Sequence, residues 1–368
     1  MLRLRGMDPY RFHRVLARSS PAQVFESSPE VLREVFRHPP TAEDLQQALR
    51  QAEADLATAQ ERGTHILTLD HPEYPAQLAP LEAAPPVLFV EGRVEVLSQV
   101  AVSIVGSRKA TAYGKRMAFK LAHDLARLGL VVVSGGAYGV DTAAHKGALE
   151  AQGATVAVLG SGVDRPYPAS NRRLFERIRE TGAVVSEFPF GTPPLRPHFP
   201  IRNRIISGLS HGVVVIEAAQ RSGALITVQW AADQGREVMA LPGPADSVLS
   251  QGPHRLIREG VALVTTAEEV LQELGLEATL SVPSQPELPQ LTPEEQRVFQ
   301  ALGTDPKTLD ALTEQLGVPP ATLMTTLLSL EIKGLIEKQP GNAYVRNPIY
   351  TEEVSHENHR PLGPTGPE

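Results

Sequence analysis

Short, almost uniformly apolar runs alternate along the middle of the chain with longer runs in which polar positions recur. The apolar runs predict strands of a parallel sheet covered on both faces. They lie at Val100–Val105, Leu130–Val133, Ala154–Leu159, Ala183–Ser186, Val213–Ile216 and Val238–Leu241. The mixed runs predict helices at Tyr113–Leu128, Asp141–Gln152, Asn171–Arg179, Ile205–Leu209 and Ala224–Gln234. Such alternation, with right-handed crossovers, gives an α/β fold with a doubly wound, mostly parallel sheet.

The N-terminal part has a helical pattern instead. Residues 8–60 predict short helices, of which one opens at Pro9 and one is an amphipathic helix from Thr41 to Gln60. Thr41 suits the start of that helix, because Asp44 lies at capping-box spacing. The segments 66–69 and 87–90 predict two short strands on either side of a proline-rich stretch.

The C-terminal part predicts a separate small domain. A stretch rich in proline and polar residues, 281–293, is typical of a linker. Helices at Thr308–Leu316 and Pro319–Lys333 follow, then apolar pairs near Leu335 and Tyr344, which together predict a winged helix. We therefore expect a helical domain, a main domain, a linker, a winged helix and a disordered tail. Their ranges are 1–62, 63–280, 281–293, 294–350 and 351–368.

Composition narrows the class of protein. The 368 residues include no cysteine, which excludes disulfides and cysteine-ligated metal sites. The longest apolar runs are far shorter than the roughly 18 residues of a membrane span, and the N-terminus lacks the apolar core of a signal peptide. We therefore expect a cytoplasmic protein that makes no contact with a membrane.

Charge is distributed unevenly along the chain. The net charge is −7, which alone argues against a nucleic-acid binder. However, residues 267–368 carry 6 basic and 16 acidic side chains, whereas residues 95–210 carry 15 basic and 8 acidic ones. The positive charge is thus concentrated in the middle of the chain, where an anionic ligand can use it.

Four polar segments follow predicted strand ends, where an open parallel sheet places its ligand crevice. Two of them, Gly106–Lys109 and the glycine-rich Ser134–Asp141, suit a phosphate through backbone amides, a guanidinium and a helix N-terminus. A turn with a purely structural role is the alternative for both. Neither the dinucleotide-binding pattern GxGxxG nor the P-loop pattern GxxxxGK[ST] is present.

The other two segments, Gly160–Arg173 and Pro197–Arg204, interleave cations with aromatic rings. This combination suits single-stranded nucleic acid, because cations hold the backbone and flat rings stack on bases. A solvated face is the alternative for a single such run, but several runs at one sheet edge favour binding.

Candidates for catalysis are weaker. Asp141 and His145 have helical i, i+4 spacing, but no third metal ligand lies nearby in the sequence, so helix capping and packing are favoured. Glu187 and Glu217 follow strands, where orienting basic groups is favoured over acid–base chemistry. We expect no catalytic residue, no metal and no cofactor.

Together, these motifs resemble the DprA/Smf family of DNA-processing proteins of natural transformation. The resemblance covers most of the chain and is strongest from about Tyr74 to Leu263. It rests on Val105–Arg108, Ser134–Asp141, Ala143–His145, Tyr167–Pro168, Asn171, Ser186–Pro189, Phe199–Ile206, Glu217–Ala218, Ser222–Thr227, Leu241–Gly243, Ser250–Gly252 and Leu256–Ile257.

The resemblance implies a SAM-like N-terminal domain and an extended Rossmann-like domain that binds and protects single-stranded DNA, forms a homodimer and helps to load the RecA recombinase. The residues expected to bind DNA are Ser107, Arg108, Ser134, Gly135, Gly136, Ala137, Tyr138, Gly139, Arg165, Tyr167, Asn171, Arg172, Phe199, Arg202, Asn203, Arg204, Ser222 and Gly223. The residues expected at the dimer interface are Leu256, Ile257 and Leu263.

Three positions depart from the family pattern. Tyr138 replaces a common arginine, which exchanges a phosphate contact for a stacking surface. Ala224 replaces a serine and removes a hydroxyl donor, and Pro253–His254 replaces a common Thr-Asn pair.

Two other functions compete with DNA recombination. A nucleotide-processing enzyme such as a phosphoribohydrolase has a related core, but its Pro-Gly-Gly-x-Gly-Thr pattern fails at Pro242–Pro244, which lacks the second glycine. A regulator that binds duplex DNA through the winged helix needs cations there, and the acidic C-terminal part opposes this reading.

Overall fold

The computed structural model describes residues 40–276, 291–303, 305–339, 341–347 and 350. The chain divides into two compact units, Met1–Pro283 and Ser284–Glu368. The predicted helix at Pro9, most of the predicted N-terminal domain and the tail 351–368 lie outside the described residues, so the predicted domain boundaries stay a prediction. In the described part of the chain, no helix is both long and apolar enough to cross a membrane.

The first unit contains a nine-stranded sheet in the order β1-β2-β6-β5-β4-β3-β7-β8-β9. Its strands are β1 (His65–Thr68), β2 (Val87–Gly92), β3 (Ala101–Val105), β4 (Val131–Ser134), β5 (Thr155–Val158), β6 (Ala183–Ser186), β7 (Gly212–Val215), β8 (Glu237–Ala240) and β9 (Ala262–Leu263). Neighbours from β6 to β9 pair in parallel, whereas β1 and β2 extend the sheet with antiparallel pairing.

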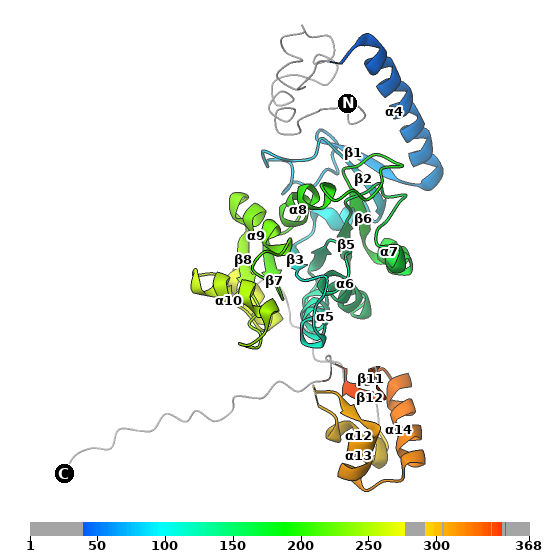
Figure 1. Cartoon of the computed structure of the whole chain (residues 1–368). Helices are drawn as coiled ribbons and strands as arrows, with labels where there is room; N and C mark the ends of the chain where they lie inside the picture. Colours follow the sequence, from blue (N-terminus) through cyan, green and yellow to red (C-terminus); the bar gives the residue numbers. More distant parts are fainter. Residues whose placement is uncertain (1–39, 277–290, 304, 340, 348–349, 351–368) are drawn as a thin grey trace, which may run out of the picture. The chain divides into compact units, whose positions relative to one another are not determined.

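Helices cover both faces of this sheet (Figure 1). They are α5 (Ala112–Arg127), α6 (Val140–Glu150), α7 (Arg172–Thr181), α8 (His198–Gly208), α9 (Ala224–Asp233), α10 (Gln251–Arg258) and α11 (Ala267–Glu273), whereas α4 (Ala42–Arg62) precedes β1 and is mostly exposed. Val132 of β4 faces α5, α6 and α11, whereas its neighbours Val131 and Val133 face α8, α9 and α10. Strands β3 to β7 are buried along their whole length, which explains why their sequences are almost entirely apolar.

The order of the strands creates a switch point between β3 and β7. The chain moves from β3 through β4 and β5 to β6 in one direction, and β7 then pairs with the opposite side of β3. The carboxyl ends of these two strands are joined by a hydrogen bond of 2.6 Å from the Ser107 amide to the Glu217 carbonyl. An open α/β sheet places its ligand crevice at such a point.

The predicted α/β fold with a doubly wound, mostly parallel sheet is confirmed. The Thr41 capping box is also present, since Thr41 Oγ1 accepts from the Asp44 amide at 3.1 Å and Asp44 Oδ2 accepts from the Thr41 amide at 2.8 Å. The fourth polar segment is not a loop: α8 begins at His198 rather than at Ile205, because its first turn tolerates Pro200. Helices α10 and α11 were not predicted.

The second unit is a winged helix. It consists of α12 (Pro293–Ala301), β10 (Lys307–Thr308), α13 (Leu309–Leu316), α14 (Pro320–Ile332), β11 (Ile336–Gln339) and β12 (Ala343–Arg346). The strands pair in the order β10-β12-β11. The predicted helices α13 and α14 are present, whereas α12, which begins at the last residue of the predicted linker, was not predicted.

Candidate nucleic-acid interface

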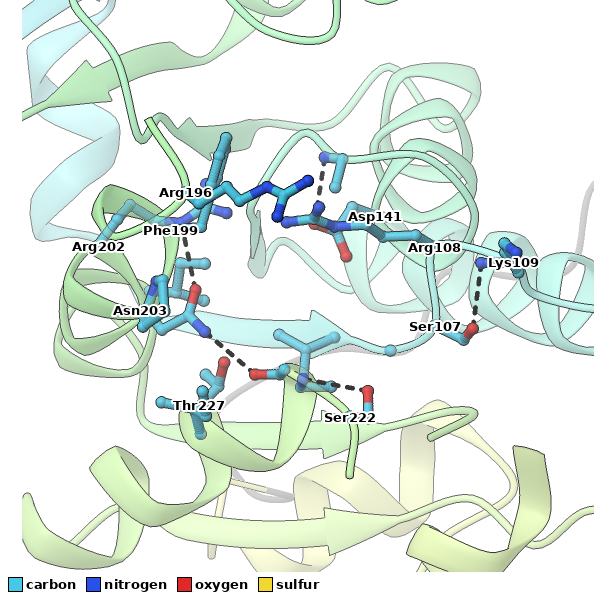
Figure 2. Close-up of a pocket in the computed structure, with 18 of the residues that line it drawn as sticks. Ser107, Arg108, Lys109, Asp141, Arg196, Phe199, Arg202, Asn203, Ser222 and Thr227 are labelled. Atoms are coloured by element: carbon cyan, nitrogen blue, oxygen red, sulfur yellow. Dashed lines mark hydrogen bonds between the residues drawn. The ribbon is translucent and has the colours of Figure 1, made fainter. Parts of the chain in front are cut away.

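A pocket of about 860 Å³ opens at the switch point of the sheet (Figure 2). Its walls come from the loop after β3, the glycine-rich loop before α6, the start of α8 and the start of α9. The polar and aromatic residues that line it are Ser107, Arg108, Lys109, Asp141, Tyr167, Arg196, Phe199, Arg202, Asn203, Ser222 and Thr227. The pocket thus joins segments that are far apart in the sequence, as expected for polar segments that follow the ends of parallel strands.

Cations and aromatic rings form a row inside the pocket. The Arg108 guanidinium carbon lies 5.0 Å from the centre of the Phe199 ring, and that of Arg202 lies 6.0 Å from the same ring. The Tyr167 and Phe199 ring centres are 5.9 Å apart. Figure 2 shows Arg108 and Arg196 extending into the pocket from opposite sides. The row offers positive charge and flat apolar surface to one ligand.

Arg202 is held more tightly than Arg108. It is buried, and its Nη1 donates to the carbonyls of Gly135, at 2.7 Å, and of Val158. Burial lowers the pKa of Arg202 to about 10, so the guanidinium stays charged at neutral pH. Arg202 therefore supplies positive potential to the pocket wall and also fixes the glycine-rich loop to β5.

Arg204 was predicted to bind DNA, and this prediction is wrong. Only 2% of the side chain is exposed, and its guanidinium donates to both carboxylate oxygens of Glu187, at 2.5 and 2.6 Å. Its Nε donates to the Ala83 carbonyl at 2.8 Å. Arg204 therefore links α8 to the end of β6 and to the segment before β2. The expectation that Glu187 orients a basic group is confirmed.

Two backbone amides of the glycine-rich loop already have partners within the protein. The Ala137 amide donates to Asp141 Oδ2 at 3.2 Å, and the Val140 amide donates to the Ser107 carbonyl at 3.2 Å. Gly139 has φ +77°, and a Cβ there would collide with the Ser107 carbonyl oxygen, so glycine is needed for this close approach. These backbone amides serve the fold.

Burial also argues against four further residues that were predicted to contact DNA. Ser134, Gly135 and Gly136 are buried, and the Ser134 hydroxyl donates to the Ile104 carbonyl at 2.7 Å. Asn171 is also buried, and its Nδ2 donates to the Gly136 carbonyl at 3.1 Å. All four residues therefore support the glycine-rich loop from the protein interior.

The remaining predicted residues divide into two groups. The structure brings Ser107, Arg108, Ala137, Tyr167, Phe199, Arg202, Asn203, Ser222 and Gly223 together in the pocket. Tyr138, Arg165 and Arg172 are exposed but do not line it.

Sequence reasoning left Lys109, Asp141, Arg196 and Thr227 out of the set of binding residues. Lys109 follows Arg108 directly, so its place in the same segment could have identified it as a binding residue. Arg196 lies in a proline-rich stretch without periodicity, and nothing in the sequence connects that stretch with the pocket.

The carboxylates and histidine considered for chemistry have structural partners. His145 is fully buried with Nδ1 2.8 Å from Thr155 Oγ1, and burial lowers its pKa to about 3. Glu217 pairs with no basic group among the described residues; its carboxylate accepts from the Thr111 amide at 2.9 Å and fixes the start of α5. Burial raises the pKa of Asp141, and the charge of Arg202 opposes this shift. The described residues contain no cluster of potential metal ligands.

The predicted dimer residues do not form one surface patch. Leu256 is 4% exposed and packs in the core beneath α10, so its assignment to an interface is wrong. Ile257 packs partly against the same core, whereas Leu263 on the edge strand β9 is 48% exposed.

The fold and the pocket define a Rossmann-like protein with a cationic, aromatic-lined site at the switch point of its sheet. Residues 65–275 match the family described as DNA recombination-mediator protein A, and residues 282–342 match the DprA winged helix domain. The chain belongs to the DNA recombination-mediator protein A family, which confirms the resemblance seen in the sequence.

Curated relatives agree with this assignment. Protein Smf of Escherichia coli K12 is 42% identical over 304 residues, which cover 80% of each chain. The crystal structure of DNA processing protein A from Streptococcus pneumoniae has 37% identity and a TM-score of 0.65, covering 74% of this chain and 95% of that one. A Helicobacter pylori DNA processing protein A, described for its single-stranded DNA binding mode, has 28% identity and a TM-score of 0.52, covering 57% and 95%.

Proposed function

We propose that this protein binds single-stranded DNA in the pocket at the switch point and acts as a recombination mediator. The observation that carries the proposal is the row formed by Arg108, Phe199 and Tyr167 inside one pocket. Family membership and the DNA-binding relative from Helicobacter pylori support it.

The lining of the pocket suits both parts of a nucleotide. Arg108, Lys109 and Arg196 supply cations for phosphates, and Ile226 and Leu249 add apolar surface. An unpaired base can enter such a slot, but a base inside a duplex cannot. Because phosphate contacts carry no sequence information, we expect little sequence preference.

The chemistry of the pocket favours binding over catalysis. Asp141 is the one carboxylate among the described residues that line it, and its Oδ2 accepts from the Ala137 amide. The described lining residues include no histidine, the side chain that most often serves in general acid–base catalysis. The competing phosphoribohydrolase function predicts release of free base from nucleoside monophosphates, and we expect none.

Arg108 provides the decisive test. Arg108→Ala is expected to weaken binding of an oligothymidine and to lower the slope of log affinity against log salt by roughly 0.7, the value per single-strand phosphate contact. Arg108→Lys should restore the charge but only part of the affinity, because the bidentate geometry is lost. Fluorescence anisotropy over a salt series measures both quantities.

Arg93 offers a matched control. It is exposed and follows β2 at the opposite edge of the sheet, where its amide donates to the Gly182 carbonyl before β6. Arg93→Ala should keep the parental affinity and slope. A folded Arg108→Ala protein with the parental affinity and slope would show that the proposed phosphate contact does not exist.

We further propose that the protein protects bound single strands, forms a homodimer through its first unit and helps to load RecA. The exposed apolar side chain of Leu263 on the edge strand β9 supports the dimer. A monomeric mass in light scattering at micromolar concentration would rule out the dimer. Failure to stimulate RecA assembly on DNA coated with a single-strand-binding protein would rule out loading, and unchanged nuclease digestion would rule out protection.

A further inference from the structure

The predicted DNA-binding residues that do not line the pocket include an exposed tyrosine, Tyr138. Building on the proposed function, we propose that Tyr138 and the exposed start of α7 form a second nucleotide subsite outside the pocket. The Tyr138 ring stacks on a base there, and Arg172 and Arg173 hold the adjoining phosphate. Affinity for a strand long enough to reach both subsites then exceeds affinity for one that fills only the pocket.

The Tyr138 ring is both exposed and fixed. It is 47% exposed, and its hydroxyl accepts from Ser170 Oγ at 3.2 Å. Among the described residues, no aromatic ring or guanidinium group packs on it. A ring tethered at its hydroxyl loses little conformational entropy when a base stacks on it.

The backbone on both sides of this contact is also fixed. Asn171, next to Ser170, donates from Nδ2 to the Gly136 carbonyl at 3.1 Å and to Thr142 Oγ1 at 2.8 Å. These bonds attach the segment before α7 to the loop that carries Tyr138. The subsite is therefore assembled before DNA binds.

Two connections join the subsite to the pocket. Ala137 lines the pocket and directly precedes Tyr138. Tyr167 lines the pocket on the other segment, is 43% exposed and lies shortly before Ser170 in the chain. In the proposed arrangement, a strand leaves the pocket over Tyr167 and reaches Tyr138 next.

Cations accompany the ring. Arg172 and Arg173 are both exposed in the first turn of α7, immediately after Asn171. Arg172 Nε lies 3.3 Å from Glu176 Oε1. This ion pair is exposed and therefore weak, so a phosphate can take the place of the Glu176 carboxylate at little cost. Stacking faces next to cations are the combination that binds single strands without regard to sequence.

The test compares oligothymidines of about 4 and about 16 nucleotides, the two ends of the range that single-strand binding folds cover. In the parent protein the longer strand binds more tightly. Tyr138→Ala is expected to reduce this length-dependent gain about tenfold, the typical effect of losing one stacked base. The salt slope should not change, because a stacking contact releases no counterions. Tyr138→Phe keeps the ring and should keep most of the gain.

Each outcome separates this subsite from the pocket. If Arg108→Ala lowers affinity for both strands but Tyr138→Ala keeps the full length-dependent gain, the subsite is disproved and the pocket is not. If Tyr138→Ala weakens both strands equally, the subsite is also disproved. If Arg108→Ala has no effect on either strand, the pocket itself is disproved. Circular dichroism melting of each variant, with Arg93→Ala as the control, confirms that the proteins compared are folded.

Discussion

At the scale of single residues, sequence reasoning identified the chemistry but not the burial of each group. Arg202 and Arg204 stand two positions apart in one motif, yet Arg204 forms a buried ion pair with Glu187, whereas Arg202 lines the pocket. Arg108 remains exposed. Nothing local in the sequence distinguishes these arginines, because their burial depends on contacts with residues up to 121 positions away.

Arg204→Ala should destabilise the first unit strongly. The substitution leaves the Glu187 carboxylate buried without its cation, which typically lowers the free energy of unfolding by about 3–5 kcal/mol. Replacing both partners by leucine should cost less, because no charge is left unpaired. Urea unfolding followed by the fluorescence of the single tryptophan, Trp230, measures both variants.

The exposed pair of Arg93 and Glu95 is the matched comparison, at 2.8 Å but with more than half of each side chain exposed. Arg93→Ala should change the free energy of unfolding by about 0–1 kcal/mol. A loss in Arg204→Ala as small as this one would contradict a structural role for the buried pair.

At the scale of elements, strands were easier to predict than helix boundaries. The parallel strands are apolar because both faces are buried, so their positions follow from local composition. The start of α8 was obscured by Pro200 and by two arginines whose burial depends on long-range contacts. Helix α12 was missed although Thr292 and Glu295 form a capping box, because the proline-rich stretch before it indicated a linker.

Glu295 connects two helices of the winged helix and should make that unit sensitive to acid. Its carboxylate accepts from Lys333 Nζ at 2.8 Å and Ser329 Oγ at 2.7 Å on α14, and these bonds lower the pKa of Glu295 to about 2. A carboxylate with a lowered folded-state pKa stabilises the fold above its unfolded value, about 4.3 for glutamate. This contribution is lost as the pH falls from that value through about 2.

Hydrogen exchange of peptides from α12 and α14 at decreasing pH measures this effect within the full chain. Exchange rates, corrected for the intrinsic effect of pH, should rise in the parent as the pH falls below about 4. Glu295→Gln should remove most of this dependence, because a neutral amide does not titrate. Peptides from the sheet of the first unit provide the internal control. Equal acid sensitivity in the parent and in Glu295→Gln would contradict the assignment.

At the scale of the whole molecule, the charge distribution assigns DNA binding to the first unit. Every residue that lines the pocket belongs to that unit, whereas the chain from residue 267 onward is strongly acidic. The exposed face of α14 carries Met324, Leu328 and Ile332, with no lysine or arginine among them. A helix that reads duplex DNA needs cations for phosphates, and α14 carries none.

A truncated protein ending at residue 280 should therefore retain single-stranded DNA binding. Removing the acidic C-terminal part takes away repulsion but no proposed contact, so the affinity should equal or exceed that of the full chain at low salt. Anisotropy titrations of both proteins at two salt concentrations measure the difference. Loss of binding by a folded truncation would assign an essential contact to the winged helix.

The hydrogen bonds that hold the glycine-rich loop have a kinetic consequence. The Val140 amide is bonded to the Ser107 carbonyl, the Ser107 amide to the Glu217 carbonyl, and Arg202 ties the same loop to β5. A site that is rigid before its ligand arrives needs no slow rearrangement on encounter, so association follows a single exponential whose rate is set by diffusion and electrostatic steering. Differences in affinity among pocket variants then lie mainly in how long each complex survives.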